Sequence, residues 1–569
     1  MNGLCEHKFR SMLLSGTFTM AVMYFVLLCD SIVAGYYIGE AGVAAINAIT
    51  PLTGVTMFFG DIVSIGASTI YAREVGAMRK RRADEIFGQG LIVSLAVGLL
   101  LAAAFQLIRD VYFSMNGTTG EILEHSLEYY RFLPLNAFLT VFVYFLEQMV
   151  YSDGDELCNN ICYAFQIGGN IVFSVILTKR LGMTGNILGS VIGNGLGILV
   201  CGWHFFRKGN TLHFVWHLSF RDFLLTSRYS IVDASLYLCW GLMDYVMIGF
   251  VSRRYGTPGL VALAMVISLL EFSAIMDGVG LAMQPLISTY FGEKNHRLIK
   301  RVIRAGIKAA LIEGAVATAL IFAFARQFCA LFGVTGGASF APSIAAVRIV
   351  SLGLTFCSAV SLTTSYYMLV DHIGIATGFT CLQYGLLNVL LPMLGSSLWG
   401  IHGVWAGIAT APVLTLICTL LFVLLRFGKE NFPFLLRDMD SEIVVMDDVL
   451  SADSPVHLAE RVRSCMLSHQ YASTVADNAA LVIAELLSCT IKKNENTKKA
   501  VLIELSLFFE DASVQIIERD SGELFEFVAS DTQVGDLSGC IPVGQTKAQR
   551  EVTYLVTTGY NRNRIRYSR

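Results

Sequence analysis

Charged residues are scarce in this sequence. Asp, Glu, Lys and Arg make up 15% of its 569 residues, against about 25% in soluble domains. Hydrophobic residues make up 54%, and the mean hydropathy is +0.60. A chain with so little polar side-chain surface cannot cover itself against water, so we expect a lipid bilayer to be its solvent.

Two other absences exclude classes of function. No strongly basic tract is present, so a nucleic-acid partner is not expected. The 13 cysteines contain no Cys-x-x-Cys pair and fall mostly within apolar runs. We interpret them as reduced, buried side chains, and we expect neither a metal site nor a cofactor.

The shortage of charge is uneven along the chain. Residues 437–569 carry 14 Lys and Arg and 20 Asp and Glu, an ordinary soluble composition, whereas residues 1–436 carry 27 and 24. The sequence therefore predicts a membrane part followed by a soluble domain. We place two membrane lobes at residues 1–215 and 216–430, a linker at 431–450 and the soluble domain at 451–569.

Apolar runs of membrane-spanning length recur twelve times, with centres near residues 24, 60, 97, 140, 168, 195, 240, 275, 310, 357, 385 and 413. Two of them, Ile86–Ile108 and Gly400–Leu425, contain no Asp, Glu, Lys or Arg. At such lengths only helices satisfy every backbone N–H and C=O within the bilayer. We predict an all-α membrane protein of twelve transmembrane helices, plus a small cytoplasmic α/β domain.

Basic residues between these runs indicate the orientation. With the N-terminus inside, the inner segments carry 19 Lys and Arg and the outer segments carry 8. Because basic residues gather on the cytoplasmic side, we predict a multi-pass protein of the cell membrane with both termini in the cytoplasm.

The two halves of the membrane part are similar to each other. Gly66–Gly76, followed by a basic stretch, is similar to Ala282–Gly292, and Leu181–Gly185 is similar to Trp399–Gly403. The spacing is about 215 residues, so each half is expected to hold six helices in the same order, as two parallel repeats. Such repeats place a transport site at their interface.

A family resemblance is carried by four segments, which are Asp30–Gly39, Ala44–Pro51, Met283–Gly292 with its Gln-Pro pair, and Gly154-Asp155 after the fourth run. They resemble the multidrug and toxic compound extrusion (MATE) family, in its MepA/DinF-like branch, over residues 10 to 427. The resemblance implies a cation-coupled antiporter, in which a proton or a sodium ion enters while an organic compound leaves.

Asp30 is the sharpest candidate for coupling. It lies in the first apolar run with no Lys or Arg within nine residues on either side. An ionised Asp at the bilayer centre costs about 2.5–3.5 kcal/mol on insertion scales, so it needs a partner, a proton or a cation. The resemblance implies a coupling-ion role. A structural Asp held by hydrogen bonds between helices is the alternative.

The resemblance also implies two polar partners for this carboxylate. Asn170 matches the family's asparagine beside the aspartate, and Ser190 stands where the family commonly has a threonine. Ser174 stands where the family usually has a second aspartate, which removes a charge and leaves the coupling ion open. Helix packing is the alternative role for Asn170 and Ser190.

Four more acids lie in apolar runs and are candidates to line a substrate cavity: Asp61, Asp244, Glu271 and Asp277. Asp61 and Asp277 each precede their repeat's marker glycine by 15 residues, so they hold equivalent positions. Glu271 lies near the same helix face as Asp277. A cavity lined with carboxylates suits cationic, apolar substrates. Solvated acids at helix ends are the alternative.

The soluble domain alternates helical and strand patterns. Leu458–His469 and Val475–Lys492 have helical periodicity, and Ala500–Phe509 and Ser513–Arg519 alternate like a β-hairpin. The order resembles the histidine-kinase-type ATP-binding fold, in its anti-sigma-factor kinase branch. The residues that match its motifs are Glu485, Asp520 and Gly522.

Departures from that motif indicate a degenerate ATPase. Cys489 replaces the asparagine that holds magnesium, Glu523-Leu524 replaces a glycine, and no glycine-rich lid precedes Glu551–Tyr567. We therefore expect a pseudo-ATPase that does not bind MgATP well and that regulates the membrane part or binds a cytoplasmic partner.

These patterns together predict a transporter and not an enzyme. The leading hypothesis is cation-coupled export of small organic compounds, cationic or amphipathic, with a proton or sodium ion and membrane lipid as the other partners. A flippase for lipid-linked precursors is an alternative, but it needs a basic cavity for pyrophosphate, and the intramembrane charge here is acidic. A membrane sensor that signals through its tail is a further alternative, which gives no reason for paired halves.

Overall fold

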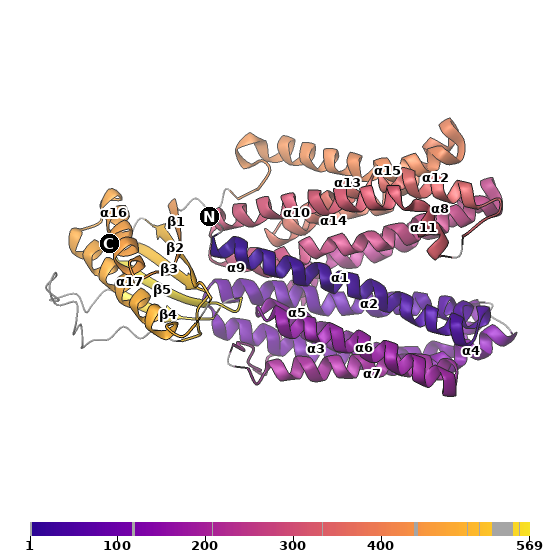
Figure 1. The fold of residues 1–569 in the computed structure, drawn as a ribbon, viewed down its shortest axis with the longest axis horizontal. Helices are drawn as coiled ribbons and strands as arrows, with labels where there is room; N and C mark the ends of the chain where they lie inside the picture. Colours follow the sequence, from indigo (N-terminus) through magenta and orange to yellow (C-terminus); the bar gives the residue numbers. More distant parts are fainter. Residues whose placement is uncertain are drawn as a thin grey trace.

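The computed structural model describes residues 3–116, 120–207, 209–332, 334–436, 442–497, 499–510, 513–525, 550–556 and 558–568. Long helices run side by side, and a small sheet with two helices lies at one end of them, where both chain termini lie (Figure 1). The first half contains α1 Leu4–Tyr37, α2 Glu40–Gly76, α3 Lys80–Asn116, α4 Gly120–Tyr130, α5 Leu133–Ser152, α6 Glu156–Leu181 and α7 Met183–His204.

The second half follows an extended segment at residues 210–219, which contains the predicted boundary between the lobes. Its elements are α8 Phe220–Ser273, the 3-10 turn η1 Ala274–Asp277, α9 Gly278–Gly292, α10 His296–Ala323, α11 Ala325–Leu331, α12 Phe340–Ser351, α13 Leu354–Leu369, α14 Ile373–Thr380, the π-helix η2 Cys381–Leu387 and α15 Asn388–Asn431.

Among the described residues, nine helical stretches are long and apolar enough to cross a membrane, or ten when the bent pair α12 and α13 counts as one span. One of the nine, Ser473–Lys493, belongs to the small domain. Two others, Phe220–Gly292 and Ile373–Asn431, are too long for one crossing, since about 20 residues suffice. The chain is therefore a multi-pass membrane protein, while twelve crossings and two repeats stay predictions.

Both long stretches bend at a glycine. Gly256 has φ of 63° and Gly400 has φ of 59°, and each lies at a kink between two helical segments. Positive φ is the region that glycine occupies without steric cost. These two residues therefore let the chain change direction between the segments.

Buried side chains form three clusters in the membrane part. One draws only on the first half, between Ala34 and Ile187, and one only on the second half, between Met243 and Ile408. The third combines residues of both halves, from Cys5 to Val423. The two halves therefore share one core while each keeps a core of its own.

The two halves approach each other closely at the repeat glycines Gly76 and Gly292. A Cβ at Gly76 of α2 would lie 2.1 Å from Thr289 O, and a Cβ at Gly292 of α9 would lie 2.1 Å from Arg73 O. No side chain fits at either distance, so glycine allows the two helix ends to touch backbone to backbone. Gln284 adds hydrogen bonds from α9 to Ser68, at 2.8 Å, and to Thr69, at 3.2 Å.

The small domain is a five-stranded antiparallel sheet in the order β1-β2-β3-β5-β4. Its strands are β1 Glu442–Val449, β2 Leu502–Phe509, β3 Ser513–Asp520, β4 Arg550–Tyr554 and β5 Asn561–Ser568. Two helices, α16 Ser454–Ser468 and α17 Ser473–Lys493, cover one face through a buried apolar cluster. We call residues 442–568 the tail domain.

The two predicted helices and the predicted hairpin of the tail domain are present, as α16, α17, β2 and β3. The predicted linker, residues 431–450, is not only a linker, because β1 lies within it and pairs with β2 along its whole length. The sheet therefore begins before the predicted domain start at Ser451.

We expect both termini to lie on the cytoplasmic side. All membrane segments that contact the tail domain belong to the predicted inner side. One measurement of the side on which the tail domain lies therefore gives the side of these segments as well. A reporter enzyme that is active only in the cytoplasm, fused after Arg569, should be active, and the same reporter inserted after Arg253, in a predicted outer segment, should be inactive. The opposite pattern would contradict the predicted orientation.

Candidate functional site

Asp30 lies in α1 and is partly buried at the centre of a hydrogen-bonded cluster. Ser190 Oγ of α7 lies 3.0 Å from Asp30 Oδ2, and Asn170 Nδ2 of α6 donates to Asp30 Oδ1 at 3.3 Å. Asn170 Nδ2 also donates to Ser190 Oγ at 2.7 Å. The three predicted coupling residues, which come from three helices, therefore meet at one carboxylate.

Two further residues that sequence reasoning missed complete this cluster. Tyr129 OH of α4 donates to Asp30 Oδ2 at 3.0 Å, and Asn186 Nδ2 of α7 donates to the Asp30 backbone O at 2.9 Å. Asn186 precedes Ser190 by one helical turn, so its place on the same face of α7 was the available signal. Tyr129 belongs to the short helix α4, which does not coincide with any of the predicted apolar runs.

Neutral donors alone contact the Asp30 carboxylate. Among the described residues, no Lys, Arg or His forms an ion pair with it. Two amide oxygens of the same cluster, Asn170 Oδ1 and Asn186 Oδ1, are buried and have no hydrogen-bond partner within the described chain. The cluster thus offers a carboxylate and two spare carbonyl oxygens, which is a donor set for a proton or a small cation.

Ser174 does not contact Asp30. Its hydroxyl donates to the Asn186 backbone O at 3.0 Å, and a Cβ at Gly189 would lie 2.0 Å from Ser174 Oγ. The small side chain therefore permits close packing of α6 against α7. An aspartate at this position would have to displace that contact.

The other predicted acids fall into two groups. Asp61 of α2 is buried, and the hydroxyls of Tyr144 and Tyr237, the latter from the second half, lie within electrostatic reach of it. Asp233 of α8, which sequence reasoning missed, lies within electrostatic reach of both Asp61 and Asp277. These three acids thus extend from the first half into the second.

The second group is smaller. Asp244 of α8 is partly exposed and has a buried Oδ1 with no partner within the described chain. Glu271 is exposed and lies within electrostatic reach of Asp244. The 3-10 turn η1 interrupts the α-helix between Glu271 and Asp277, so their place on one helix face stays a prediction.

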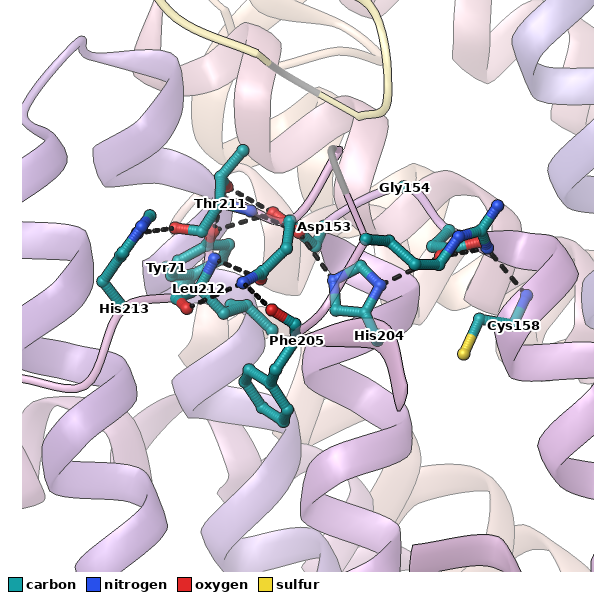
Figure 2. A network of polar contacts seen from close by, with 12 residues as sticks. Tyr71, Asp153, Gly154, Cys158, His204, Phe205, Thr211, Leu212 and His213 are labelled. Atoms are coloured by element: carbon teal, nitrogen blue, oxygen red, sulfur yellow. Dashed lines mark hydrogen bonds and ion pairs between the residues drawn. The ribbon is translucent and has the colours of Figure 1, made fainter. Parts of the chain in front are cut away.

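A separate polar network lies at the Gly154-Asp155 turn (Figure 2). His204, at the end of α7, contacts Asp153 Oδ2 through Nε2 and Asp155 Oδ2 through Nδ1, both at 2.9 Å. Asp153 also accepts hydrogen bonds from Thr211 N, at 2.9 Å, and from Tyr71 OH, at 2.9 Å. The network ties α2, the α5–α6 turn, the end of α7 and the extended segment together.

Asp155, Cys158 and His204 lie close enough to hold a metal ion, but their hydrogen bonds favour another use. Both ring nitrogens of His204 already face carboxylates, which leaves neither as a free ligand. Burial raises the pKa of Asp155, but hydrogen bonds from His204 and Cys158 N–H and the charge of Arg207 outweigh it, so the pKa is lowered. We interpret the cluster as a charged brace between helix ends.

The tail domain docks on the end of the helices where α2 and α9 meet. Arg562 of β5 is 1% exposed, and it donates to Val75 O at 2.9 Å and to Gly76 O at 2.7 Å, at the carboxyl end of α2. The same guanidinium lies 3.0 Å from Glu293, which follows α9. Arg519 of β3 forms ion pairs with Glu293 and with Glu504.

Further contacts widen this interface. Arg301 of α10 pairs with Asp447 of β1 at 2.6 Å, and Asn295 Nδ2 donates to Ser506 Oγ of β2 at 3.1 Å. A Cβ at Gly154, where φ is 92°, would lie 2.0 Å from the backbone carbon of Thr558. The sheet face that α16 and α17 leave open is therefore covered by the membrane part.

The three motif residues of the tail domain have different surroundings. Asp520 is fully buried and accepts hydrogen bonds from Gly522 N, at 2.8 Å, and from Asn561 Nδ2, at 3.0 Å. Gly522 packs against Asn494, because a Cβ there would lie 2.4 Å from Asn494 Nδ2. Glu485 is partly buried on α17. The sequence predicts that no glycine-rich phosphate lid precedes Glu551. Residues 526–549, where such a lid would lie, are outside the described residues.

Comparison with known proteins identifies relatives that share most of their length with this chain. The multidrug export protein MepA of Staphylococcus haemolyticus is 23% identical over 398 residues, which cover 68% of this chain and 86% of the relative. The multidrug export protein MepA of Staphylococcus saprophyticus is 23% identical over 424 residues, with 69% and 88% covered.

Solved structures share the fold. A crystal structure of MATE in complex with MaL6 has a TM-score of 0.70 at 20% identity, with 75% of this chain and 97% of that chain covered. An outward-facing conformation of a multidrug resistance MATE family transporter has a TM-score of 0.69 at 20% identity, with 75% and 96% covered. The MatE family model matches residues 17–176 and 233–391, more than half of the sequence. The chain belongs to the MatE family of transporters.

Proposed function

We propose that this protein is a cation-coupled antiporter that exports small organic compounds, cationic or amphipathic, across the cell membrane. The observation that carries the proposal is the Asp30 carboxylate, which neutral donors hold in place and no basic side chain of the described chain neutralises. A carboxylate in this state takes up and gives off a cation, which is the step that coupling needs.

The neighbours of Asp30 suit this exchange. Tyr129, Asn170 and Ser190 donate hydrogen bonds, so they hold the carboxylate in place without fixing its charge. When a proton or sodium ion arrives, the spare oxygens of Asn170 and Asn186 are available as further ligands or acceptors. Because the cluster joins α1 to α4, α6 and α7, occupancy of the carboxylate changes how these helices attract one another.

The acids between the halves support a cationic substrate. Asp61, Asp233 and Asp277 place negative charge where the two halves meet, and a bound organic cation would lower their mutual repulsion. The names of the relatives also support export of drugs, since both are called multidrug export proteins. The flippase alternative needs a basic site, and these acids disfavour it.

Asp30→Asn should abolish gradient-driven efflux while the protein stays folded and inserted. The substitution keeps the shape of the side chain and removes the charge that a cation neutralises. Uptake of a fluorescent cationic dye into inside-out vesicles, under an imposed pH or sodium gradient, measures the effect, and the rate should fall to the level of empty vesicles.

Asp110→Asn is the matched control for this experiment. Asp110 is an exposed acid of the same half, at the end of α3, where it pairs with Arg109 at 2.8 Å. Its loss should leave the transport rate unchanged. Normal transport by the Asp30→Asn protein would show that Asp30 is structural and that coupling lies elsewhere.

We propose that the tail domain regulates transport by holding the cytoplasmic ends of the two halves together. Arg562 contacts α2 of the first half and Glu293 of the second with one guanidinium. Separation of α2 from α9 at this end would break either the hydrogen bonds from Arg562 to Val75 O and Gly76 O or its ion pair with Glu293. A hydrogen bond to a charged group contributes about 1.5–3 kcal/mol. The docked tail therefore favours the state that is closed at this end.

Removal of the tail domain should leave the membrane part able to transport, because its helices satisfy their own backbone hydrogen bonds. The rate should rise, because the end that the tail holds closed then opens more readily. Glu293→Gln should act in the same direction, because it weakens the pairs with Arg519 and Arg562. The dye assay measures the rate, and limited proteolysis measures release of the tail. Arg566→Gln is the control, because Arg566 is an exposed residue of β5, the strand that carries Arg562.

A complete loss of transport in a well-inserted truncated protein would contradict a purely regulatory tail. An unchanged rate in both Glu293→Gln and the truncated protein would show that docking does not influence the transport cycle.

We also propose that the tail domain is a pseudo-ATPase and supplies no energy. Cys489 on α17 offers no oxygen ligand for magnesium at the place where the resembled fold has an asparagine. Calorimetry of the full-length protein with ATP and magnesium should show no binding in the micromolar range and no phosphate release. Micromolar affinity with turnover would overturn this proposal.

A further inference from the structure

A row of glycines brings α7 into close contact with α6. Four glycines of α7 follow one another at intervals of four residues, so they lie along one face of the helix: Gly185, Gly189, Gly193 and Gly197. A Cβ at Gly193 would lie 2.4 Å from Gln166 O of α6, and a Cβ at Gly197 would lie 3.3 Å from Cys162 Sγ. The two helices therefore pack with little side-chain volume between them along this face.

Cys201 continues this face one turn further, and its sulfur meets that of Cys162 on α6. The two Sγ atoms lie 3.4 Å apart, and both thiols are free and fully buried. A disulfide joins its sulfurs at about 2.05 Å, so an approach of about 1.4 Å separates this pair from a bond. Because the two helices are already in close contact, rotation of the side chains supplies that approach with little movement of the backbone.

A carboxylate lies beside the first of these thiols. Glu147 of α5 is 2% exposed, and Cys162 Sγ donates a hydrogen bond to Glu147 Oε1 at 3.3 Å. Among the described residues, no Lys, Arg or His forms an ion pair with Glu147, and its other titratable neighbour is the phenol of Tyr163. Glu147 belongs neither to the Asp30 cluster nor to the acids between the halves. Its carboxylate is therefore available to accept the proton of Cys162.

We propose that Cys162 and Cys201 form a site of reversible oxidation, at which a small uncharged peroxide converts the two thiols into a disulfide between α6 and α7. The thiolate is the form of cysteine that attacks an oxidant, and Glu147 produces it by accepting the thiol proton. Because both sulfurs are buried within helices of the membrane part, the oxidant has to be small and without charge. Hydrogen peroxide has both properties. This site does not rest on the coupling role proposed for Asp30.

The reaction balances with hydrogen peroxide as the oxidant. The thiolate sulfur of Cys162 attacks one peroxide oxygen, the O–O bond breaks, and the leaving hydroxide takes the proton from Glu147 to form water. Cys162 is then a sulfenic acid. The sulfur of Cys201 attacks the sulfur of Cys162, the S–O bond breaks, and the leaving hydroxide takes the Cys201 proton to form a second water. The two thiols lose two electrons, and one peroxide is reduced to two waters.

The same residues are less suited to a metal ion. Two thiols and one carboxylate provide three ligands, whereas a structural zinc site has four. A third cysteine of α6, Cys158, lies with Asp155 and His204 instead. A disulfide needs only the two sulfurs that are already in contact.

The disulfide would tie together two of the helices that hold the Asp30 carboxylate. Asn170 follows Cys162 by about two turns of α6, and Ser190 precedes Cys201 by about three turns of α7. Both side chains donate hydrogen bonds to Asp30. Oxidation therefore adds a covalent restraint to the helix pair beside the candidate coupling site.

Peptide mapping of the oxidised full-length protein tests the proposal. The purified protein is treated with hydrogen peroxide, the remaining thiols are blocked with N-ethylmaleimide, and unreduced peptides are identified by mass spectrometry. A linked pair of peptides that contains Cys162 and Cys201 should be the first disulfide to form, with the loss of two of the 13 thiols. Dithiothreitol should reverse it.

Three variants test the roles of the residues. Cys201→Ser should stop the reaction at the sulfenic acid of Cys162, which dimedone labels. Glu147→Gln should slow disulfide formation about a hundredfold, the lower end of what a general base contributes. Cys158→Ser, one turn from Cys162 on the same helix, is the matched control and should leave the rate unchanged. Each variant is first checked for a single symmetrical peak in size-exclusion chromatography, and Cys201→Ser tests the site if Glu147→Gln does not fold.

A second thiol pair provides a comparison within the same molecule. Cys239 of α8 and Cys381 of η2 lie within electrostatic reach of each other and are less buried, and within the described chain no carboxylate lies within such reach of Cys239. If exposure alone decided oxidation, this pair would react first. Reaction of Cys239 and Cys381 ahead of Cys162, absence of the Cys162–Cys201 peptide pair, or an unchanged rate in a folded Glu147→Gln protein would overturn the proposal.

Discussion

An acid within a lipid bilayer has to be paired, protonated or bound to a cation, and this constraint organises the membrane part of the protein. Asp30 receives hydrogen bonds from Tyr129, Asn170 and Ser190, which hold the carboxylate in place without balancing its charge. The same constraint applies to Glu147 of α5, which accepts a hydrogen bond from the Cys162 thiol. Because neither acid has a basic partner within the described chain, both are suited to exchange and not to permanent pairing.

At the end of the helices beside the tail domain, the two halves are joined by close glycine contacts and by buried charged side chains. Gly76 and Gly292 bring α2 and α9 into backbone contact, so the two halves touch there without an intervening layer. The tail domain then covers this junction with Arg519 and Arg562, which share Glu293. The two halves also share an apolar core. Opening this end would therefore separate core side chains, and it would break either the hydrogen bonds from Arg562 to α2 or the ion pair of Arg562 with Glu293.

Much of this arrangement can be predicted from the sequence, and there are physical reasons why the remainder cannot. The apolar runs predict membrane helices because backbone groups in lipid have no other partners, and the family resemblance brings Asn170 and Ser190 to Asp30. The roles of Tyr129 and Asp233 could not be predicted, because a short helix and a single acid give no periodic sequence signal. The strand β1 could not be predicted, because the acids within Glu442–Val449 mask its alternation. The docking of the tail domain could not be predicted, because it joins residues far apart in sequence, such as Val75 and Arg562.

Countertransport without any imposed ion gradient tests the central claim most directly. Proteoliposomes of the full-length protein, loaded with a fluorescent cationic dye, are diluted into dye-free buffer that contains a pH indicator or a sodium indicator. Efflux of the dye should drive an opposite movement of protons or sodium, in proportion to the dye that leaves. Dye efflux with no accompanying cation movement would contradict the account, because transport would then not be coupled through a carboxylate.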